Sequence, residues 1–258
     1  MTDYGLVSII TPSYNTAKFI GETIRSVQAQ TYPNWEMIIV DDCSTDNTDE
    51  VVAEYRKADD RIRYFKNEKN SGAAVSRNKA LREAKGRWMA FLDSDDLWVP
   101  EKLEKQLKFM VENGYHFSCH YSEDISEDGQ KMNIITKSPK RISKAGMHNY
   151  CFVGCLTAMY DASYVGLVQI EDIKKNNDYA IWLKVIRKCD CYCLTECLAL
   201  YRLRKGSISR HSKTNLIKWH YRLWHDAEGL TPIVSSLNTM RNIIFGVYKK
   251  IFLLKKIQ

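Results

Sequence analysis

The stretch that decides the fold is Trp88-Met89-Ala90-Phe91-Leu92-Asp93-Ser94-Asp95-Asp96, in which an apolar run ends abruptly in three carboxylates. Apolar residues on both faces are typical of a strand buried inside a parallel sheet. The carboxylates then follow the carboxyl end of that strand, where the ligand crevice of an open α/β sheet lies. The sequence therefore predicts an α/β protein with a site beside these acids.

The three acids repel one another, so holding them together is costly without a cation or hydrogen-bond donors. A hard divalent ion such as Mg²⁺ or Mn²⁺, which bridges carboxylates to the phosphates of a substrate, meets this requirement. The alternative is a solvated turn before a helix that begins at Pro100. Spacing alone leaves both interpretations open, because two aspartates separated by one residue are common by chance.

Upstream of this stretch, short apolar strands alternate with short helices. The strands are predicted at residues 6–11, 35–40 and 62–65, and the helices after Thr16 and from residue 71. This alternation indicates βαβ units with right-handed crossovers. A second acid pair, Asp41 and Asp42, ends the second strand, and neighbouring strands lie about 4.8 Å apart, so both acid groups can share one crevice. The glycine-rich fingerprints of dinucleotide-binding proteins and phosphate-loop ATPases are absent from the sequence, which excludes these classes.

Composition predicts one large domain with a modest extension, since 258 residues with 45% hydrophobic content can bury a full core. No apolar run is long enough to span a bilayer, and the chain starts without a signal-peptide pattern, so a cytoplasmic location is expected. The eight cysteines are expected to be free thiols.

Charge is placed unevenly along the chain. The net charge is +7, and residues 202–258 carry 12 Lys and Arg against two acids, so the tail has +10 and the remainder −3. A basic tail predicts an anionic partner, either a membrane surface or a nucleic acid.

Four segments, residues 8–15, 39–46, 70–78 and 91–96, resemble in order the motifs of family-2 glycosyltransferases. The resemblance is closest over roughly the first 110 residues. Within this family, the sequence is similar to the bacterial branch that builds capsular, exopolysaccharide or O-antigen repeat units. It implies a GT-A-type fold, with a mixed, mostly parallel sheet flanked by helices. Residues 1–210 would form the glycosyltransferase domain, with a nucleotide-binding half (1–113) and an acceptor half (114–210), and residues 211–258 a basic helical extension.

The resemblance also implies a set of residues around a nucleotide-sugar donor. They are Pro12, Tyr14, Asn15, Asp41, Asp42, Ser44, Arg77, Asp93, Ser94, Asp95, Arg202 and Arg210, with His211 as an alternative to Arg210. Asp41 or Asp42 would form a hydrogen bond with the nucleobase of the donor, and Asp93 would approach its ribose. Asp95, together with Asp93, would hold the Mn²⁺ or Mg²⁺ that bridges the diphosphate. Core packing of Tyr14 and a surface salt bridge of Arg77 are the structural alternatives.

Asp178 matches the second acid of a family acid pair that leads into a helix with a Trp-Leu step, although Asn177 stands in place of the first acid. The resemblance implies that Asp178 is the catalytic base of an inverting enzyme. The alternative is that Asp178 caps the helix, which Asp does well.

The second half of the chain gives weaker local signals. A helix is predicted at residues 100–113, strands at 117–121 and 154–160, a hairpin turn at 127–130 and a basic loop at 138–147. Cys189, Cys191 and Cys193 share a strand face, about 6.6 Å apart, which is wider than one zinc ion accommodates without bending. We expect small buried residues there rather than a structural zinc site, which favours closer spacing.

The tail predicts an amphipathic helix with Ile244, Val247, Tyr248, Ile251 and Leu254 on one face. Five cations accompany that face, namely Arg241, Lys249, Lys250, Lys255 and Lys256. This pattern favours peripheral contact with an anionic membrane, and the alternative is a closing helix packed on the core. Nucleic acid is not expected as a partner, because the face is aliphatic and lacks stacking aromatics in a groove.

These features together predict a metal-dependent, inverting glycosyltransferase that uses a UDP-sugar and a glycan or lipid-linked acceptor in surface polysaccharide synthesis. Guanosine and thymidine donors, and the choice between Mn²⁺ and Mg²⁺, stay open. A sugar-phosphate nucleotidyltransferase is an alternative, although it requires a glycine-rich loop where Pro12 to Asn15 stand. The second alternative is a catalytically inactive scaffold that binds a nucleotide sugar.

Overall fold

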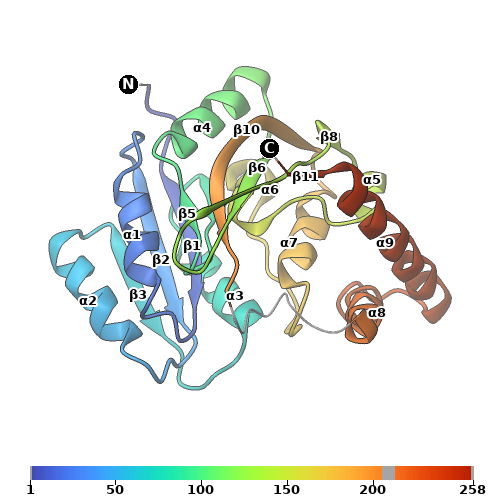
Figure 1. Ribbon diagram of the computed structural model, residues 1–258, viewed down its shortest axis with the longest axis horizontal. Helices are drawn as coiled ribbons and strands as arrows, with labels where there is room; N and C mark the ends of the chain where they lie inside the picture. Colours follow the sequence, from blue (N-terminus) through green and yellow to red (C-terminus); the bar gives the residue numbers. More distant parts are fainter. Residues whose placement is uncertain (1, 205–212, 257–258) are drawn as a thin grey trace.

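The structure of the chain, a computed structural model, describes residues 2–204 and 213–256. Over these residues a single mixed sheet of eleven strands crosses the molecule, with helices on both faces (Figure 1). The predicted α/β class with a mixed sheet is therefore confirmed.

The first half of the chain supplies four parallel strands. In sheet order they are β3 (Ile62–Lys66), β2 (Trp35–Asp41), β1 (Val7–Ser13) and β4 (Trp88–Phe91). Every residue of β1, β2 and β4 is buried, as the apolar runs predicted. Because the strands are parallel, their carboxyl ends meet at one edge of the sheet.

Three helices cover the two faces of this parallel half. Helices α1 (Ile20–Gln28) and α2 (Thr48–Ala58) share a core layer with Ile9 of β1. Helix α3 (Ala73–Glu83) lies in the opposite layer with Ile10. Successive residues of a strand point to opposite faces, which explains why neighbouring isoleucines belong to different cores.

The second half of the chain extends the sheet mainly with antiparallel strands. After β5 (Leu97–Trp98) and α4 (Lys102–Asn113) come β6 (Phe117–Ile125), β7 (Lys131–Thr136), β9 (Met159–Asp161), the short α6 (Ala162–Val165) and β10 (Cys191–Arg202). β6 is antiparallel to β7 and β9, and β9 is antiparallel to β4. β10 runs parallel to β6. Among the described strands, the other parallel pairs all belong to the β3-β2-β1-β4 group.

Residues 138–147, predicted as a loop, instead contain ordered structure. β8 (Arg141–Ile142) pairs with β10, and α5 (Lys144–Asn149) follows it. The Ser143 hydroxyl accepts a hydrogen bond from the Gly146 amide at 3.3 Å and caps α5. Tertiary pairing overrode the polar, basic composition that favoured a loop.

The strand predicted at 154–160 begins later than expected. Residues Cys155–Thr157 form a 3₁₀ turn, in which the Thr157 hydroxyl donates to the Gly154 carbonyl at 2.8 Å. Only Met159 onward pairs with β4. The local hydrogen bond competes with strand formation, as Thr side chains often do.

The cysteines are free thiols, and Cys191 and Cys193 are buried on β10. Cys193 lies opposite Cys119 of β6 in the parallel register. These thiols therefore act as small apolar groups between two strands.

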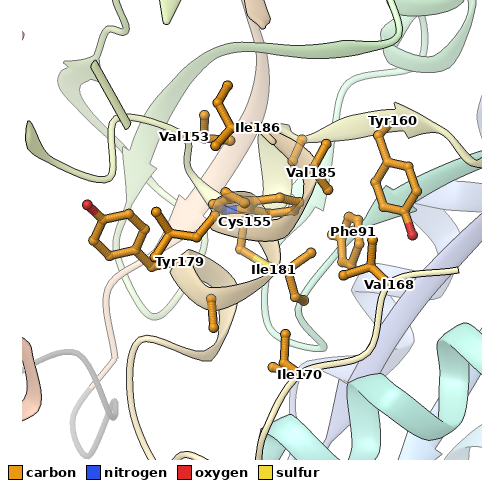
Figure 2. Packing of buried hydrophobic residues seen from close by; sticks show 14 of the residues in the cluster. Phe91, Val153, Cys155, Tyr160, Val168, Ile170, Tyr179, Ile181, Val185 and Ile186 are labelled. Atoms are coloured by element: carbon orange, nitrogen blue, oxygen red, sulfur yellow. The ribbon is translucent and has the colours of Figure 1, made fainter. Parts of the chain in front are cut away.

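Helix α7 (Asn177–Val185) is fixed by a dense apolar cluster. Its Ile181 belongs to the same cluster as Phe91 at the end of β4, as Figure 2 shows. The ring of Trp182 meets Phe91 edge-on, with 4.9 Å between centroids. Because Phe91 lies two residues before Asp93, this packing anchors α7 beside the turn formed by residues 93–96, which we call the acid turn.

The C-terminal extension is mostly helical over its described residues, but the predicted amphipathic helix ends at Phe252, and Leu254, Lys255 and Lys256 form a strand instead because they pair with β7. Helix α8 (Lys213–Arg222) continues into a π-helical turn (Leu223–Ala227), and α9 (Pro232–Phe252) leads into β11 (Leu254–Lys256). β11 pairs with β7, so the main path of the sheet is β11-β7-β6-β9-β4-β1-β2-β3. Among the described helices, none combines the length and the hydropathy that crossing a membrane requires.

Helix α9 packs on the body of the molecule through polar side chains. The buried residues on α9 are Ser235, Asn238, Thr239 and Asn242. Asn242 accepts a hydrogen bond from Trp224 Nε1 at 2.8 Å and donates to the carbonyls of His148 and Asn149 at 3.0 and 2.8 Å. The closing-helix alternative is therefore right about contact with the core. Phe245 joins the polar residues in this contact, whereas the predicted apolar face, with Ile244 and Ile251, is exposed.

We predict that Asn242→Ala destabilises the attachment of α9, because the Trp224 indole N–H loses its acceptor in a buried position. The free energy of unfolding should fall by about 1–3 kcal/mol, measured by urea denaturation, and amide exchange should rise in α9. Ser236→Ala, at an exposed position of α9, is the matched control. Equal stability of the two variants would contradict the anchoring role of Asn242.

Candidate active site

The turn after β4 places Asp93, Ser94, Asp95 and Asp96 at the carboxyl edge of the parallel strands. Asp96 is buried, and Asp93 and Asp95 are half-buried. Burial, followed by the charge of Asp93, raises the pKa of Asp95, and burial raises the pKa of Asp96 well above its ordinary value. Among the described groups, Asp96 Oδ2 has no hydrogen-bond partner. The turn therefore concentrates negative charge that cations stabilise.

Two guanidinium groups lie on the half-buried acids. Arg77 Nη2 donates to Asp93 Oδ1 at 2.5 Å, and Arg204 Nε donates to Asp95 Oδ2 at 2.5 Å. Both are charge-assisted hydrogen bonds, which are stronger than neutral ones. The acid turn is thus partly neutralised by the protein itself.

Arg202 lies beneath the turn and holds it in place. Its backbone amide donates to Asp96 Oδ1 at 2.8 Å, and its Nε donates to the Asp95 carbonyl at 2.8 Å. The remaining guanidinium nitrogens reach the Glu127 carbonyl at 2.8 Å and Glu22 Oε2 at 2.6 Å. Arg202 is therefore engaged by protein groups, and its direct contact with a donor stays a prediction. Arg210 and His211 lie outside the described residues.

The loop after β1 and the loop after β2 meet at the same edge. Pro12 is buried, whereas Tyr14 is 44% exposed just beyond it. The Asn15 amide donates to Ser44 Oγ at 2.8 Å, and Asn15 Oδ1 accepts from the Thr45 amide at 2.8 Å. Asn15 is also in the left-handed region, with φ 50°. The residues predicted to line a base and ribose pocket are thus brought together.

Asp41 and Asp42 both support neighbouring backbone. Asp41 is fully buried and accepts from the Tyr64 hydroxyl at 2.8 Å. Asp42 accepts from the amides of Ser71 and Gly72 at 2.9 and 2.7 Å, and so shapes the loop that leads into α3. Their hydrogen bond to a nucleobase stays a prediction.

Asp178 lies in the first turn of α7 and does not cap it, because the N-cap is Asn176, with φ 59°. The carboxyl is half-buried. Burial raises the pKa of Asp178, and the nearby charge of Arg77 opposes this effect without cancelling it. A carboxylate with a raised pKa is suited to accepting a proton.

Arg77 joins the acid turn to α7. Its side chain is buried, and Nη1 donates to Asn177 Oδ1 while Nη2 reaches Asp93 and lies 3.5 Å from Cys155 Sγ. Asn177 precedes Asp178 and is 100 residues from Arg77 in sequence. Sequence reasoning missed Asn177 and Cys155 as partners, because no local pattern signals a contact over this separation.

The described residues contain no group of three or more His, Cys, Asp or Glu side chains placed to hold a metal ion. Asp93 and Asp95 supply two carboxylates from one turn. This donor set fits Mg²⁺ or Mn²⁺, which commonly binds one or two carboxylates and completes its shell with water and phosphate oxygens.

Comparison with known sequences gives close relatives. The family model described as "Glycosyl transferase family 2" matches residues 8–164. TuaG of Bacillus subtilis (strain 168), a glycosyltransferase assigned provisionally to teichuronic acid biosynthesis, is 46% identical over 205 residues, 79% of this chain and 81% of TuaG. The Escherichia coli UDP-Glc:alpha-D-GlcNAc-diphosphoundecaprenol beta-1,3-glucosyltransferase WfgD is 36% identical over 264 residues, 98% of this chain and 97% of WfgD.

Comparison with solved structures supports the same fold. The mannosyltransferase PcManGT from Pyrobaculum calidifontis, solved in complex with GDP-Man and Mn²⁺, superposes with a TM-score of 0.66 at 17% identity. The match covers 93% of this chain and 70% of PcManGT. At this identity the likeness concerns the fold alone.

We predict that Arg77→Met lowers the free energy of unfolding by about 2–3 kcal/mol, because Asp93 and Asn177 lose a buried partner. The expected loss is below that of a fully buried pair, since Asp93 is 31% exposed. Arg82→Met, at a more exposed position of the same helix, is the control. Urea denaturation measures the free energy of unfolding of both variants. An equal loss in the two would contradict the role of Arg77 as the residue that links Asp93 to Asn177.

Proposed function

The chain belongs to glycosyl transferase family 2, and we propose that it transfers a sugar, with inversion, from a nucleotide-diphosphate sugar to a hydroxyl group of a glycan or lipid-linked acceptor. The reaction would serve the synthesis of a cell-surface polysaccharide. One observation supports this assignment most directly, namely that Arg77 connects Asp93 in the acid turn with Asn177 beside Asp178. A donor-side acid and a candidate base are thereby held at one site.

In this mechanism Asp178 accepts the proton of the acceptor hydroxyl while the hydroxyl oxygen forms a bond to the anomeric carbon. The bond from that carbon to the diphosphate oxygen breaks on the opposite face, and the nucleoside diphosphate leaves with the electron pair. A divalent cation on Asp95 and Asp93, when bound, offsets the charge of the leaving diphosphate. Arg77 keeps α7 and the acid turn in register throughout.

A UDP-sugar is the donor that we propose first, because WfgD is named as a UDP-Glc-dependent glucosyltransferase and aligns with 98% of the chain. The pocket would be formed by Pro12, Tyr14 and Asn15 with the Asp41–Ser44 loop. Metal dependence is supported by the two carboxylates of the acid turn, and PcManGT has Mn²⁺ in its complex. Family membership leaves the nucleotidyltransferase alternative without support.

The test for the base is Asp178→Asn, which keeps the size of the side chain but cannot accept a proton. We expect kcat to fall about 10²–10⁴-fold with little change in donor affinity. In the unchanged protein, activity should be lost as the pH falls through the pKa of Asp178, which burial raises above its ordinary value. Asp172→Asn, at an exposed loop position, is the matched control.

Near-normal turnover by Asp178→Asn would exclude Asp178 as the base. Absence of both transfer and donor hydrolysis by the unchanged protein, across UDP-, GDP- and dTDP-sugars with Mn²⁺, would favour the inactive scaffold.

We further propose that the acceptor is lipid-linked and that the protein meets it as a peripheral protein on the inner face of the cell membrane. WfgD is named for an acceptor that contains diphosphoundecaprenol, a lipid carrier. A protein that acts on such a substrate gains from binding the membrane surface, because this raises the local concentration of the acceptor.

Helix α9 offers a suitable surface, since its apolar face is exposed. The large apolar residues exposed on α9 are Ile233, Val234, Leu237, Met240, Ile243, Ile244, Val247, Tyr248, Ile251 and Phe252. Ile251 alone is 64% exposed. A continuous apolar face of this length is unusual on a soluble surface and is typical of partner or membrane contact.

The charges around this face favour an anionic bilayer as the occupant. Of the five predicted cations, Lys250, Lys255 and Lys256 are exposed near the end of α9. Arg241 instead donates to Asn149 Oδ1, and Lys249 points inward to the Cys151 carbonyl at 3.4 Å. Each exposed cation near an anionic leaflet is worth about 1 kcal/mol, so three supply a reversible attraction.

The same helix lies close to the proposed base. Lys249 of α9 contacts Cys151, and burial together with the charge of Asp178 raises the pKa of the Cys151 thiol. A membrane-bound α9 would therefore bring the acceptor side of the site near the lipid surface.

We predict that the protein co-sediments with vesicles that contain phosphatidylglycerol, less in high salt, and not with pure phosphatidylcholine. Ile244→Gln with Ile251→Gln should abolish binding while donor hydrolysis persists. Val111→Gln with Leu167→Gln, at exposed apolar positions outside α9, is the control pair. No binding at low salt, or a stable dimer that the α9 variant dissolves, would overturn the membrane proposal.

A further inference from the structure

Arg202 and Arg204 emerge from the end of β10 with different surroundings. Arg202 is buried and donates to three protein oxygens with its guanidinium. The Leu203 amide donates to the Ile125 carbonyl at 2.8 Å. The backbone is therefore fixed up to residue 203, and Arg204 starts from a rigid point.

The Arg204 side chain reaches back to the acid turn. Its Nε lies 2.5 Å from Asp95 Oδ2, and its guanidinium carbon is 5.6 Å from the centre of the Phe19 ring. The side chains of Arg204 and Asp95 are 24% and 18% exposed. Arg204 thus occupies an oxygen of the carboxylate that would bind the metal, at a place that solvent can reach.

Arg77, which pairs with the other candidate metal ligand, Asp93, is fixed more firmly than Arg204. Arg77 on Asp93 is buried and also donates to Asn177, so its displacement would disrupt α7. Arg204 has an ion pair with Asp95 and ring contact with Phe19, and unlike Arg77 it is partly exposed. Of the two, Arg204 is the cation that can exchange.

The charges of the acid turn make such an exchange favourable. The carboxylates of Asp93 and Asp95 already pair with the guanidinium groups of Arg77 and Arg204. The Arg202 guanidinium pairs with Glu22 instead and donates to the Asp95 carbonyl. A divalent cation that binds Asp93 and Asp95 adds two positive charges beside carboxylates that each already have a cationic partner. The cost falls if one guanidinium leaves and pairs with the diphosphate of the donor instead.

We propose that Arg204 is the counter-ion of Asp95 in the unloaded enzyme and competes with the divalent cation for this carboxylate. Cation binding then releases the guanidinium to the donor diphosphate. This inference rests on the proposed function for the assignment of Asp95 as a metal ligand. Because metal and nucleotide each favour the released arrangement, they bind with positive coupling, and the coupling is reciprocal.

The test compares two affinities that should change in opposite directions in Arg204→Met. Mn²⁺ without nucleotide, followed by the electron paramagnetic resonance signal of free Mn²⁺, should bind about tenfold more tightly, because its competitor is gone. The tighter of UDP and GDP, measured by calorimetry at saturating Mn²⁺, should bind about tenfold more weakly, because the diphosphate loses a cation. General damage to the site would weaken both.

Two further variants complete the comparison. Lys18→Met removes an exposed cation that pairs with Glu127 near the site, and both affinities should stay as in the unchanged protein. Arg204→Lys keeps the charge and should restore most of the nucleotide affinity. Thermal melting of each variant verifies folding.

The outcomes separate this inference from the metal proposal. If Asp95→Ala abolishes Mn²⁺ binding but Arg204→Met leaves it unchanged or weaker, the competition is overturned and the metal site stands. If Mn²⁺ binding survives Asp95→Ala, the metal proposal is overturned and the competition with it.

Discussion

The buried guanidinium of Arg77 is the interaction on which the rest of the site depends. It spans from α3 to Asp93 after β4 and to Asn177 at the start of α7. A planar group with fixed donor directions can hold two such partners only in one relative arrangement. The positions of the acid turn and of Asp178 are therefore linked, and desolvation makes the arrangement costly to break. Arg204, by contrast, pairs with Asp95 where water has access, so one arginine organises the site while the other can respond to what binds there.

An amphipathic helix usually buries its apolar side on the protein, whereas α9 buries mainly polar residues and exposes its apolar side. Its buried side is polar, and Asn242 satisfies the Trp224 indole and two backbone carbonyls there. Hydrogen bonds to buried groups are specific in direction, so they fix the orientation of the helix, and Phe245 adds an apolar contact with the core. The hydrophobic residues are then left on the surface, beside Lys250 and the cations of β11. The helix therefore has a largely polar face on the enzyme and an exposed apolar face, where we propose that the membrane binds.

Local patterns predicted most of the first half of the chain. The strands around Ile9, Ile38 and Phe91 were identified because burial on both faces leaves unbroken apolar runs. Patterns were less informative in the second half, where α5 was predicted as a loop and the start of β9 was placed too early. Both errors concern short elements whose formation depends on a single cap or a neighbouring strand, which sequence periodicity does not reveal.

The sequence by itself determined the fold class, the family and the presence of acids at the ends of two strands, because these follow from short-range order along the chain. The tertiary structure alone decided which side chains meet. Arg77 and Asn177 are 100 residues apart, and Arg204 and Asp95 are separated by 109. It also decided that α9 buries its polar side, although hydrophobic periodicity predicts the opposite for a packed helix. The physical reason is that a contact between distant segments depends on how whole layers pack, and no local pattern encodes that packing.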